Sequence, residues 1–185
     1  MINTVDNSKF SNDWYNPGRN SLIRLAWYFV NSVVFQSYLF PIYGVKNFLL
    51  RLFGASIGVG VIIKPSVNIK YPWHLKIGNH VWIGENVWID NLADVTIGDS
   101  VCISQGALIL TGNHNYSKKS FDLILGKTVI EDGVWIGARS VVCPGISCKS
   151  HSILTAGSVA SKNMESYCIY QGIPALKVRS RVIKE

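Results

Sequence analysis

His114 is the residue of this 185-residue chain best suited by its surroundings to acid–base chemistry. It ends the segment Thr111-Gly112-Asn113-His114, which opens a polar stretch over about 110–129. An imidazole has an unperturbed pKa of about 6.5, so at neutral pH it can accept a proton from an attacking hydroxyl. From this segment alone, a histidine that only hydrogen-bonds its own loop is an equally good interpretation.

The elements that hold this segment are predicted by a six-residue repeat of aliphatic residues, at Ile57, Ile63, Ile69, Ile77, Ile83, Ile89, Ile97, Ile103 and Ile109. A period of six fits neither the 3.6-residue period of a helix nor the alternation of a lone strand. It is typical of a β-solenoid with flat sheet faces. Three repeats then make one triangular coil, in which the first residue of each repeat points into the prism.

The repeat is interrupted where His114 lies. Equivalent positions are 20 residues apart from Ile57 to Ile77 and from Ile77 to Ile97, but 33 apart from Ile97 to Ile130. About 15 residues must therefore leave the wall, and a loop held by a rigid scaffold is a usual place for chemistry. We predict roughly five coils over 57–162 with an excursion loop at about 110–129, an N-terminal cap over 1–56 and a C-terminal tail over 163–185.

The other histidines and the cysteines do not form a pattern typical of a metal site. His74 and His80 are six residues apart, so they fall on successive faces of the prism and point about 120° apart. Such a pair cannot easily share a zinc ion at the ~2.0–2.1 Å that imidazole ligation needs. The four cysteines lack CxxC spacing, which argues against a disulfide framework and against zinc. We expect no metal.

Composition and charge limit the choice of partners. With 48% hydrophobic and 16% charged residues, the chain is long enough for one core. The net charge is +7, but the basic clusters are not interleaved with aromatic residues. We therefore expect no nucleic acid partner, whereas a phosphorylated small molecule or an anionic membrane surface fits the charge. No secretory signal opens the chain, which favours a cytoplasmic location, with the inner face of the membrane as a refinement.

The residues from Leu25 to Val45 include no charged side chain and several aromatic ones. The length alone would suit a membrane span, but Asn31 interrupts the apolar run and Pro41 would break a helix near its end. We favour a helix packed on the solenoid or on a neighbouring subunit, followed by a short helix that Gly54 ends. Peripheral membrane contact through residues 22–53 is the second interpretation, and a true span is the third.

Placed along this framework, an ordered set of motifs resembles the hexapeptide-repeat O-acetyltransferases: Thr111-Gly112-Asn113-His114, Val134-Trp135-Ile136-Gly137-Ala138, Ala156-Gly157-Ser158-Val159 and Gly172-Ile173-Pro174-Ala175. The branch that acts in exopolysaccharide (colanic acid type) biosynthesis is the most similar, with maltose and galactoside acetyltransferases more distant. The resemblance implies an all-β fold, a left-handed parallel β-helix with an N-terminal helical segment. It also implies a homotrimer with acetyl-CoA, as co-substrate, in each cleft between subunits.

The same resemblance assigns roles to single residues. His114 matches the general base that deprotonates the sugar hydroxyl, and Trp135 matches the residue that lines the pantetheine channel. The other expected CoA contacts are Ala138 and Ala156 for the pantetheine arm, Ser161 and Lys162 for the nucleotide end, and Lys177 and Arg179 as further phosphate partners.

Asp90 and Asn91 follow Ile89 where relatives contact the acceptor sugar. A satisfied turn is an equally good interpretation of this pair, because Asx residues favour corners. Serine acetyltransferases tend to carry their catalytic histidine at the position of Asn91, so serine is disfavoured as the acceptor. Asn115 stands where exopolysaccharide relatives often have an aspartate after the base.

Two functions from different classes follow. The first is an acetyl-CoA-dependent O-acetyltransferase that acts on a sugar hydroxyl, in a polysaccharide repeat unit or a lipid-linked oligosaccharide precursor, by direct attack in a ternary complex. The alternative is a non-catalytic trimeric scaffold or binding protein built from the same repeat. A zinc-dependent hydratase is disfavoured by the histidine spacing.

Overall fold

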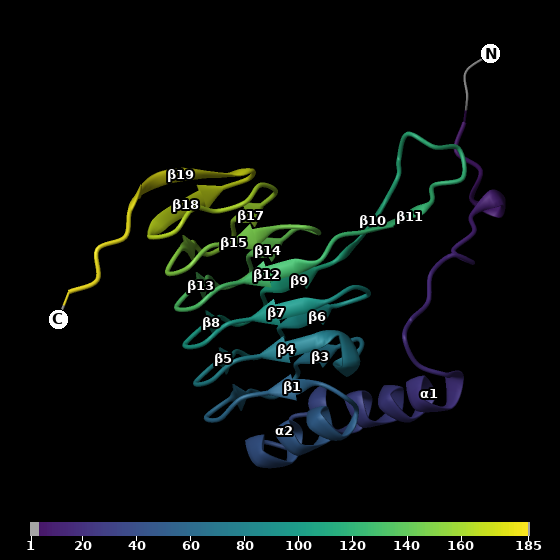
Figure 1. Cartoon of the computed structure of the whole chain (residues 1–185), viewed down its shortest axis with the longest axis horizontal. Coiled ribbons are helices and arrows are strands. Elements are labelled where there is room, and N and C mark those ends of the chain that lie inside the picture. The colour runs from purple at the N-terminus through teal and green to yellow at the C-terminus, as the bar shows by residue number, and fades with distance from the viewer. Residues whose placement is uncertain (1–3, 185) are drawn as a thin grey trace.

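The computed structural model describes residues 4–184, most of which wind into a three-sided parallel β-solenoid (Figure 1). The first face contains β1 (Ser56–Ile57), β4 (Leu75–Ile77), β7 (Val95–Ile97), β12 (Thr128–Ile130) and β15 (Ser147–Cys148). The second contains β2 (Ile62–Ile63), β5 (Trp82–Ile83), β8 (Cys102–Ile103), β13 (Trp135–Ile136), β16 (Ile153–Leu154), β18 (Cys168–Gly172) and β19 (Ala175–Ser180). The third contains β3 (Asn68–Ile69), β6 (Trp88–Asp90), β9 (Leu108–Leu110), β14 (Val141–Val142) and β17 (Val159–Ala160).

The six-residue repeat forms the core, as predicted. Ile57 pairs with Ile77, Ile77 with Ile97, and Ile97 with Ile130, so equivalent residues stack directly above one another. All of these side chains are buried. Cys148 continues the same stack, and burial raises the pKa of its thiol to about 12. It therefore behaves as a small apolar residue.

Residues beyond the regular repeat lie at one edge of the prism, between the third and first faces, which we call the third corner. The first two coils add short turns there, one of which includes the 3₁₀ helix η3 (Pro72–His74). The third coil adds the predicted excursion, which is largely an antiparallel hairpin of β10 (Gly112–His114) and β11 (Leu123–Leu125). Figure 1 shows this hairpin projecting away from the prism.

The solenoid continues beyond residue 162. Met164 bridges to Cys148, and β18 pairs in parallel with β16, so part of the expected tail extends the second face. The chain then reverses, and β19 pairs antiparallel to β18.

Helices cover the other end of the prism (Figure 1). After the short helix η1 (Asn7–Lys9), the cap consists of α1 (Ser21–Val30), a π-helical turn η2 (Asn31–Phe35) and α2 (Tyr43–Leu52). Gly54 follows α2 with φ of +97°, a conformation that suits glycine. Among residues 4–184, no helix is long and apolar enough to cross a bilayer.

The cap also satisfies the open edge of the first coil, which has no coil beneath it. Four cap side chains each donate a hydrogen bond to a main-chain carbonyl there: Lys46 to Lys64 (2.9 Å), Asn47 to Val61 (2.8 Å), Arg51 to Ile57 (2.9 Å) and Trp27 to Ile69 (2.8 Å). Exposed strand edges are sites of unwanted strand pairing. These side chains therefore end the stack on all three faces.

Candidate active site

His114 lies at the end of β10, and a main-chain carbonyl fixes its protonation pattern. Its Nδ1 is 2.8 Å from the carbonyl oxygen of Phe121 across the hairpin. A carbonyl oxygen can only accept a hydrogen bond, so Nδ1 must carry the proton. In the neutral imidazole the lone pair is then on Nε2, and His114 is prepared to act as a base through that atom.

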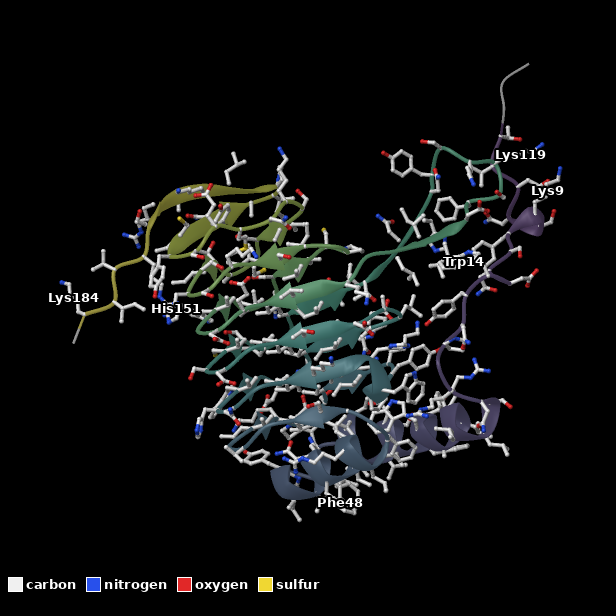
Figure 2. The ribbon with its side chains drawn as sticks, viewed as in Figure 1. Lys9, Trp14, Phe48, Lys119, His151 and Lys184 are labelled. Carbon is white, nitrogen blue, oxygen red and sulfur yellow. The ribbon has the colours of Figure 1, made fainter. Side chains whose placement is uncertain are left out.

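Two phenylalanines contact the imidazole, one from the hairpin and one from the N-terminal part of the chain. The ring of Phe121 stacks on it at 4.5 Å with an interplanar angle of 7°, and the ring of Phe10 lies at 5.8 Å. Phe10 belongs to an N-terminal arm (residues 6–19) whose Asp6 N–H donates to the Lys119 carbonyl at 2.9 Å. Figure 2 shows Lys9 of this arm beside Lys119 near the tip of the hairpin. The arm therefore positions the candidate base.

Thr111 anchors the base of the hairpin. Its side chain is fully buried; the hydroxyl donates to the Asp90 carbonyl at 2.9 Å and accepts from the Ala93 N–H at 3.0 Å. Both partners belong to the third corner of the preceding coil. The hairpin is therefore bound to a rigid part of the scaffold.

One recess adjoins the hairpin and shares three lining residues with a second recess, so the two form one continuous surface. The recess nearer His114 is lined by Phe10, Asn12, Asp13, Tyr15, Pro17, Arg24, Lys70, Tyr71, Leu92 and Leu123. The second shares Arg24, Lys70 and Tyr71 and extends over Trp27, Tyr28, Asn31, Gln36, Asn68 and Trp88. The Nε of Arg24 is buried without a hydrogen-bond partner. Aromatic rings beside polar groups suit a sugar or another polar ring.

Asp90 is connected to this recess through an ion pair. Its Oδ1 is 3.1 Å from the Nζ of Lys70, one of the lining residues. The nearby Tyr15 hydroxyl donates to the Leu92 carbonyl at 2.9 Å, and its pKa is raised by burial and then by Tyr71 and Asp90. Tyr15 is therefore a neutral phenol at physiological pH.

Asn91 has a different environment from Asp90. Its side chain is fully buried, accepts from the N–H of Tyr71 at 3.0 Å and donates to the carbonyl of the same residue at 2.6 Å. Both functions of the amide are thus used within the wall. This placement favours the satisfied-turn interpretation of Asn91 over acceptor contact.

The residues expected to hold pantetheine lie on the second face and at its edge with the third, which we call the second corner. Trp135 is 46% exposed, and its Nε1 donates to the Ser104 hydroxyl at 2.9 Å. The Ala138 carbonyl accepts from the Gly157 N–H at 2.8 Å, which sets Ala138 against the turn that contains Ala156. Small side chains at these two positions leave main-chain groups accessible.

The residues expected at the nucleotide end lie toward the last coil. Ser161 and Lys162 are exposed directly after β17, and Arg179 is exposed on β19. Lys177 pairs with Glu165 at 2.7 Å, and this hydrogen bond raises the pKa of Lys177. Its charge is therefore partly offset by a carboxylate within the same chain.

The structure does not bring the two groups of candidate residues together within one chain. The hairpin with His114 projects from the third corner, whereas β13 with Trp135 lies on the opposite side of the prism in Figure 1. A site that needs both groups would therefore combine residues from different copies.

His74 and His151 have structural surroundings, and His80 is exposed. The Nδ1 of His74 is 3.0 Å from Asp94, and the ring of His151 stacks on Tyr167 at 4.8 Å. Over the part of the chain that the structure describes, no three His, Cys, Asp or Glu side chains are grouped to hold a metal ion.

Comparison with known proteins identifies the family. No family model matches the chain. A hexapeptide-repeat acetyltransferase of Vibrio cholerae, solved with acetyl-CoA, has a TM-score of 0.78 and 25% identity over 88% of each chain. WcaF of Escherichia coli K12, an acetyltransferase assigned to colanic acid biosynthesis, is 34% identical over 168 residues, 91% of this chain and 92% of WcaF. The chain belongs to the hexapeptide-repeat acetyltransferases.

This membership confirms the resemblance derived from the motifs. The galactoside O-acetyltransferase of Escherichia coli is a more distant match, 28% identical over 72% of this chain and 68% of its own length. The protein is therefore an acyltransferase. Its fold is the β-solenoid that the six-residue repeat predicted.

Sequence reasoning missed the two aromatic residues that hold His114. Phe121 could have been noticed as an apolar residue in a polar loop, seven residues after the histidine. No signal in the sequence pointed to Phe10, because its contact with His114 depends on how the N-terminal arm runs across the hairpin.

Proposed function

We propose that this acetyltransferase uses acetyl-CoA to acetylate a sugar hydroxyl in polysaccharide biosynthesis, with His114 as the general base. The observation that carries the proposal is the hydrogen bond from Nδ1 of His114 to the Phe121 carbonyl, which leaves Nε2 as the proton acceptor. The donor is supported by the acetyl-CoA complex of the Vibrio cholerae relative. The assignment of WcaF to colanic acid biosynthesis supports the polysaccharide context.

The chemistry is direct attack in a ternary complex. Nε2 of His114 takes the proton from the acceptor hydroxyl as its oxygen forms a bond to the thioester carbonyl carbon. The carbonyl oxygen becomes an oxyanion, which main-chain N–H donors stabilise. The carbon–sulfur bond then breaks, CoA leaves as the thiolate, and the proton held by His114 is available to it.

Orientation of the base comes from a carbonyl rather than a carboxylate. Asn115 occupies the position where exopolysaccharide relatives often have an aspartate, and the nearby Asp122 side chain is paired with Lys118 at 3.0 Å. A carbonyl fixes the tautomer as a carboxylate would. It offers less stabilisation to the imidazolium that forms during the reaction, because it carries only a partial charge.

The proposed acceptor site is the recess between the arm and the hairpin. It places Tyr71, Arg24 and Lys70 within one surface that ends at Phe10, beside His114. Asp90 contributes through its ion pair with Lys70. A sugar could stack on the aromatic rings and bind the polar groups through its hydroxyls.

The proposed donor site uses the residues on the second face and second corner. Trp135 would line the pantetheine channel, the main chain at Ala138 and Ala156 would bind the pantetheine amides, and Ser161, Lys162, Lys177 and Arg179 would approach the nucleotide. Because this group lies across the prism from His114, we place each complete site between neighbouring subunits of a homotrimer.

The test compares His114→Ala with His80→Asn as a matched control. His80 is exposed with φ of +55°, a conformation that asparagine also tolerates. Thiol release from acetyl-CoA would be followed with a panel of free hexoses and nucleotide-diphosphate hexoses. We expect His114→Ala to lower turnover by roughly 10²–10⁴-fold, with His80→Asn unchanged.

A thermal-shift measurement with CoA separates the possible failures. We expect CoA to stabilise the wild-type protein and both variants to the same extent. Near-normal turnover by His114→Ala would refute the base. Absence of any stabilisation of the wild-type protein at saturating CoA would favour the non-catalytic scaffold.

A further inference from the structure

The helical cap exposes two apolar stripes on the side that faces away from the solenoid. On α1 the stripe contains Leu22, Leu25 and Phe29, and on α2 it contains Val45, Phe48 and Leu52. Residues spaced by three and four share one face of a helix. Leu22 is 76% exposed, Phe48 61% and Leu52 65%. In Figure 2, Phe48 lies on the outer side of α2, at the end of the molecule farthest from the later coils.

These stripes are not the faces that pack on the solenoid. Trp27, Phe35 and Leu50 already bury the inner sides of the cap against the first coil. The outer apolar residues therefore add nothing to the core. Exposed apolar side chains gathered along one helix face normally mark a contact with a partner or a membrane.

The charge around the stripes has one sign. Residues 14–84 contain seven of the 18 Lys and Arg residues and none of the 11 Asp and Glu residues, so the rest of the chain is formally neutral. This segment includes α1, α2 and the first coil, whereas the second coil also carries Glu85, Asp90 and Asp94, and Asp90 pairs with Lys70. The charged residues of α1 and α2 are all basic, and this favours the approach of an anionic surface to the helical end of the molecule.

Two arginines lie directly beside the stripes. Arg51 is exposed on α2 and is anchored by hydrogen bonds to the carbonyls of Ile57 and Gly58 at 2.9 Å. Arg19 lines a recess together with Ile23 and Leu52. Lys46 does not take part, because its ammonium group is buried under the cap.

We propose that this end of the protein docks on a membrane surface that contains anionic phospholipid. Helices that lie in the interface bury an apolar face among the acyl chains while their basic residues meet the headgroups. A second copy using the same surface would present the same basic residues, and α1, η2 and α2 contain no acidic residue to offset them. The inference uses no residue of the hairpin, so it stands apart from the proposed acetyl transfer.

The experiment is flotation of the full chain with lipid vesicles. One set would contain phosphatidylglycerol and phosphatidylethanolamine, and the other only phosphatidylcholine. We expect binding to the anionic vesicles, weakened at 0.5 M salt because salt screens the attraction. The double variant Arg19→Gln, Arg51→Gln should bind roughly 10-fold or more weakly, since each basic residue near such a surface contributes about a fivefold effect.

A stripe variant, Phe29→Ser with Phe48→Ser, tests the apolar part. Its matched control is Val182→Ser with Ile183→Ser, two exposed aliphatic residues near the other terminus. The stripe variant should lose vesicle binding and keep its melting temperature, whereas the control should bind as the wild-type protein does.

Equal flotation with both vesicle types, or no effect of the stripe variant, would overturn the proposal. The proposal would also be overturned if the wild-type protein did not bind vesicles and the stripe variant eluted at a different size in gel filtration. That result would make the stripes a contact between copies. Failure of vesicle binding with normal acetyl transfer would refute only the docking surface, and the reverse result would refute only the proposed chemistry.

Discussion

Lys46 offers a test of how the cap is attached to the solenoid. Its side chain is completely buried, its ammonium group donates to the Lys64 carbonyl, and burial lowers its pKa from 10.5 to about 8. That lowering corresponds to about 3 kcal/mol by which the folded state disfavours the charged form. Below pH 8 the folded and the unfolded protein both hold the proton, so the full penalty applies.

As the pH rises from about 8 to 10.5, the folded protein releases this proton while the unfolded chain keeps it. The free energy of unfolding should therefore increase with pH over this window, because the unfolded state binds more protons. A Lys46→Met variant removes the titrating group at nearly constant volume. Between pH 7.5 and 10, the wild-type protein should gain about 2 kcal/mol relative to this variant.

The measurement is urea denaturation at several pH values, with Lys76→Met as the matched control because Lys76 is an exposed lysine on the first face. The control should follow the wild-type curve over the whole range. If the difference between wild type and Lys46→Met stayed constant from pH 7.5 to 10, the ammonium group would not be buried in solution, and the described attachment of α2 would be wrong.

Three further predictions concern the core, the hairpin and the second corner. Replacing Thr111 with valine should lower the free energy of unfolding by about 1–3 kcal/mol, because the Ala93 N–H that the hydroxyl satisfies would be left unpaired. The same change should lower turnover. A variant as stable and active as the wild-type protein would contradict this prediction. In alkylation followed by mass spectrometry, Cys148 should react only after denaturant is added, whereas the partly exposed Cys102 should be modified in the folded protein. Equal rates for the two thiols would show that the core opens readily. Gly137→Ala should cost about 1–3 kcal/mol in chemical denaturation, because the added Cβ would lie 2.5 Å from the main-chain nitrogen of Ala156; an unchanged midpoint would mean that this corner is looser than described.

The solenoid could be predicted from the sequence because each coil repeats the same local rule. An apolar residue every six positions must point inward, and the parallel register from Ile57 to Cys148 is kept because the extra residues of the first three coils all fall at one corner. The position of the excursion was predictable for the same reason, since the step of 33 residues cannot be absorbed by one regular coil.

The interior of the candidate site could not be predicted in this way. The sequence indicated a polar loop over 110–129. In the structure, Leu123-Ile124-Leu125 forms β11, which pairs with β10 outside the solenoid wall. The contact between Phe10 and His114 joins segments about 100 residues apart that share no repeat. For Asn91 the sequence left acceptor contact and a satisfied turn equally open, and only the fold shows that the Tyr71 main chain uses its amide.

The unequal spacing of the coils has a consequence for how such a chain can change over time. The additions of two residues in each of the first two coils and the hairpin of the third all fall at the third corner, whereas the step from Ile130 to Cys148 has none. Insertions at this corner leave the isoleucines of successive coils stacked on one another. An insertion within a face would instead shift the register of every later coil. Under the proposed function, new acceptor preferences can therefore arise by lengthening or shortening the segments at this one corner, while the stacked strands stay the same.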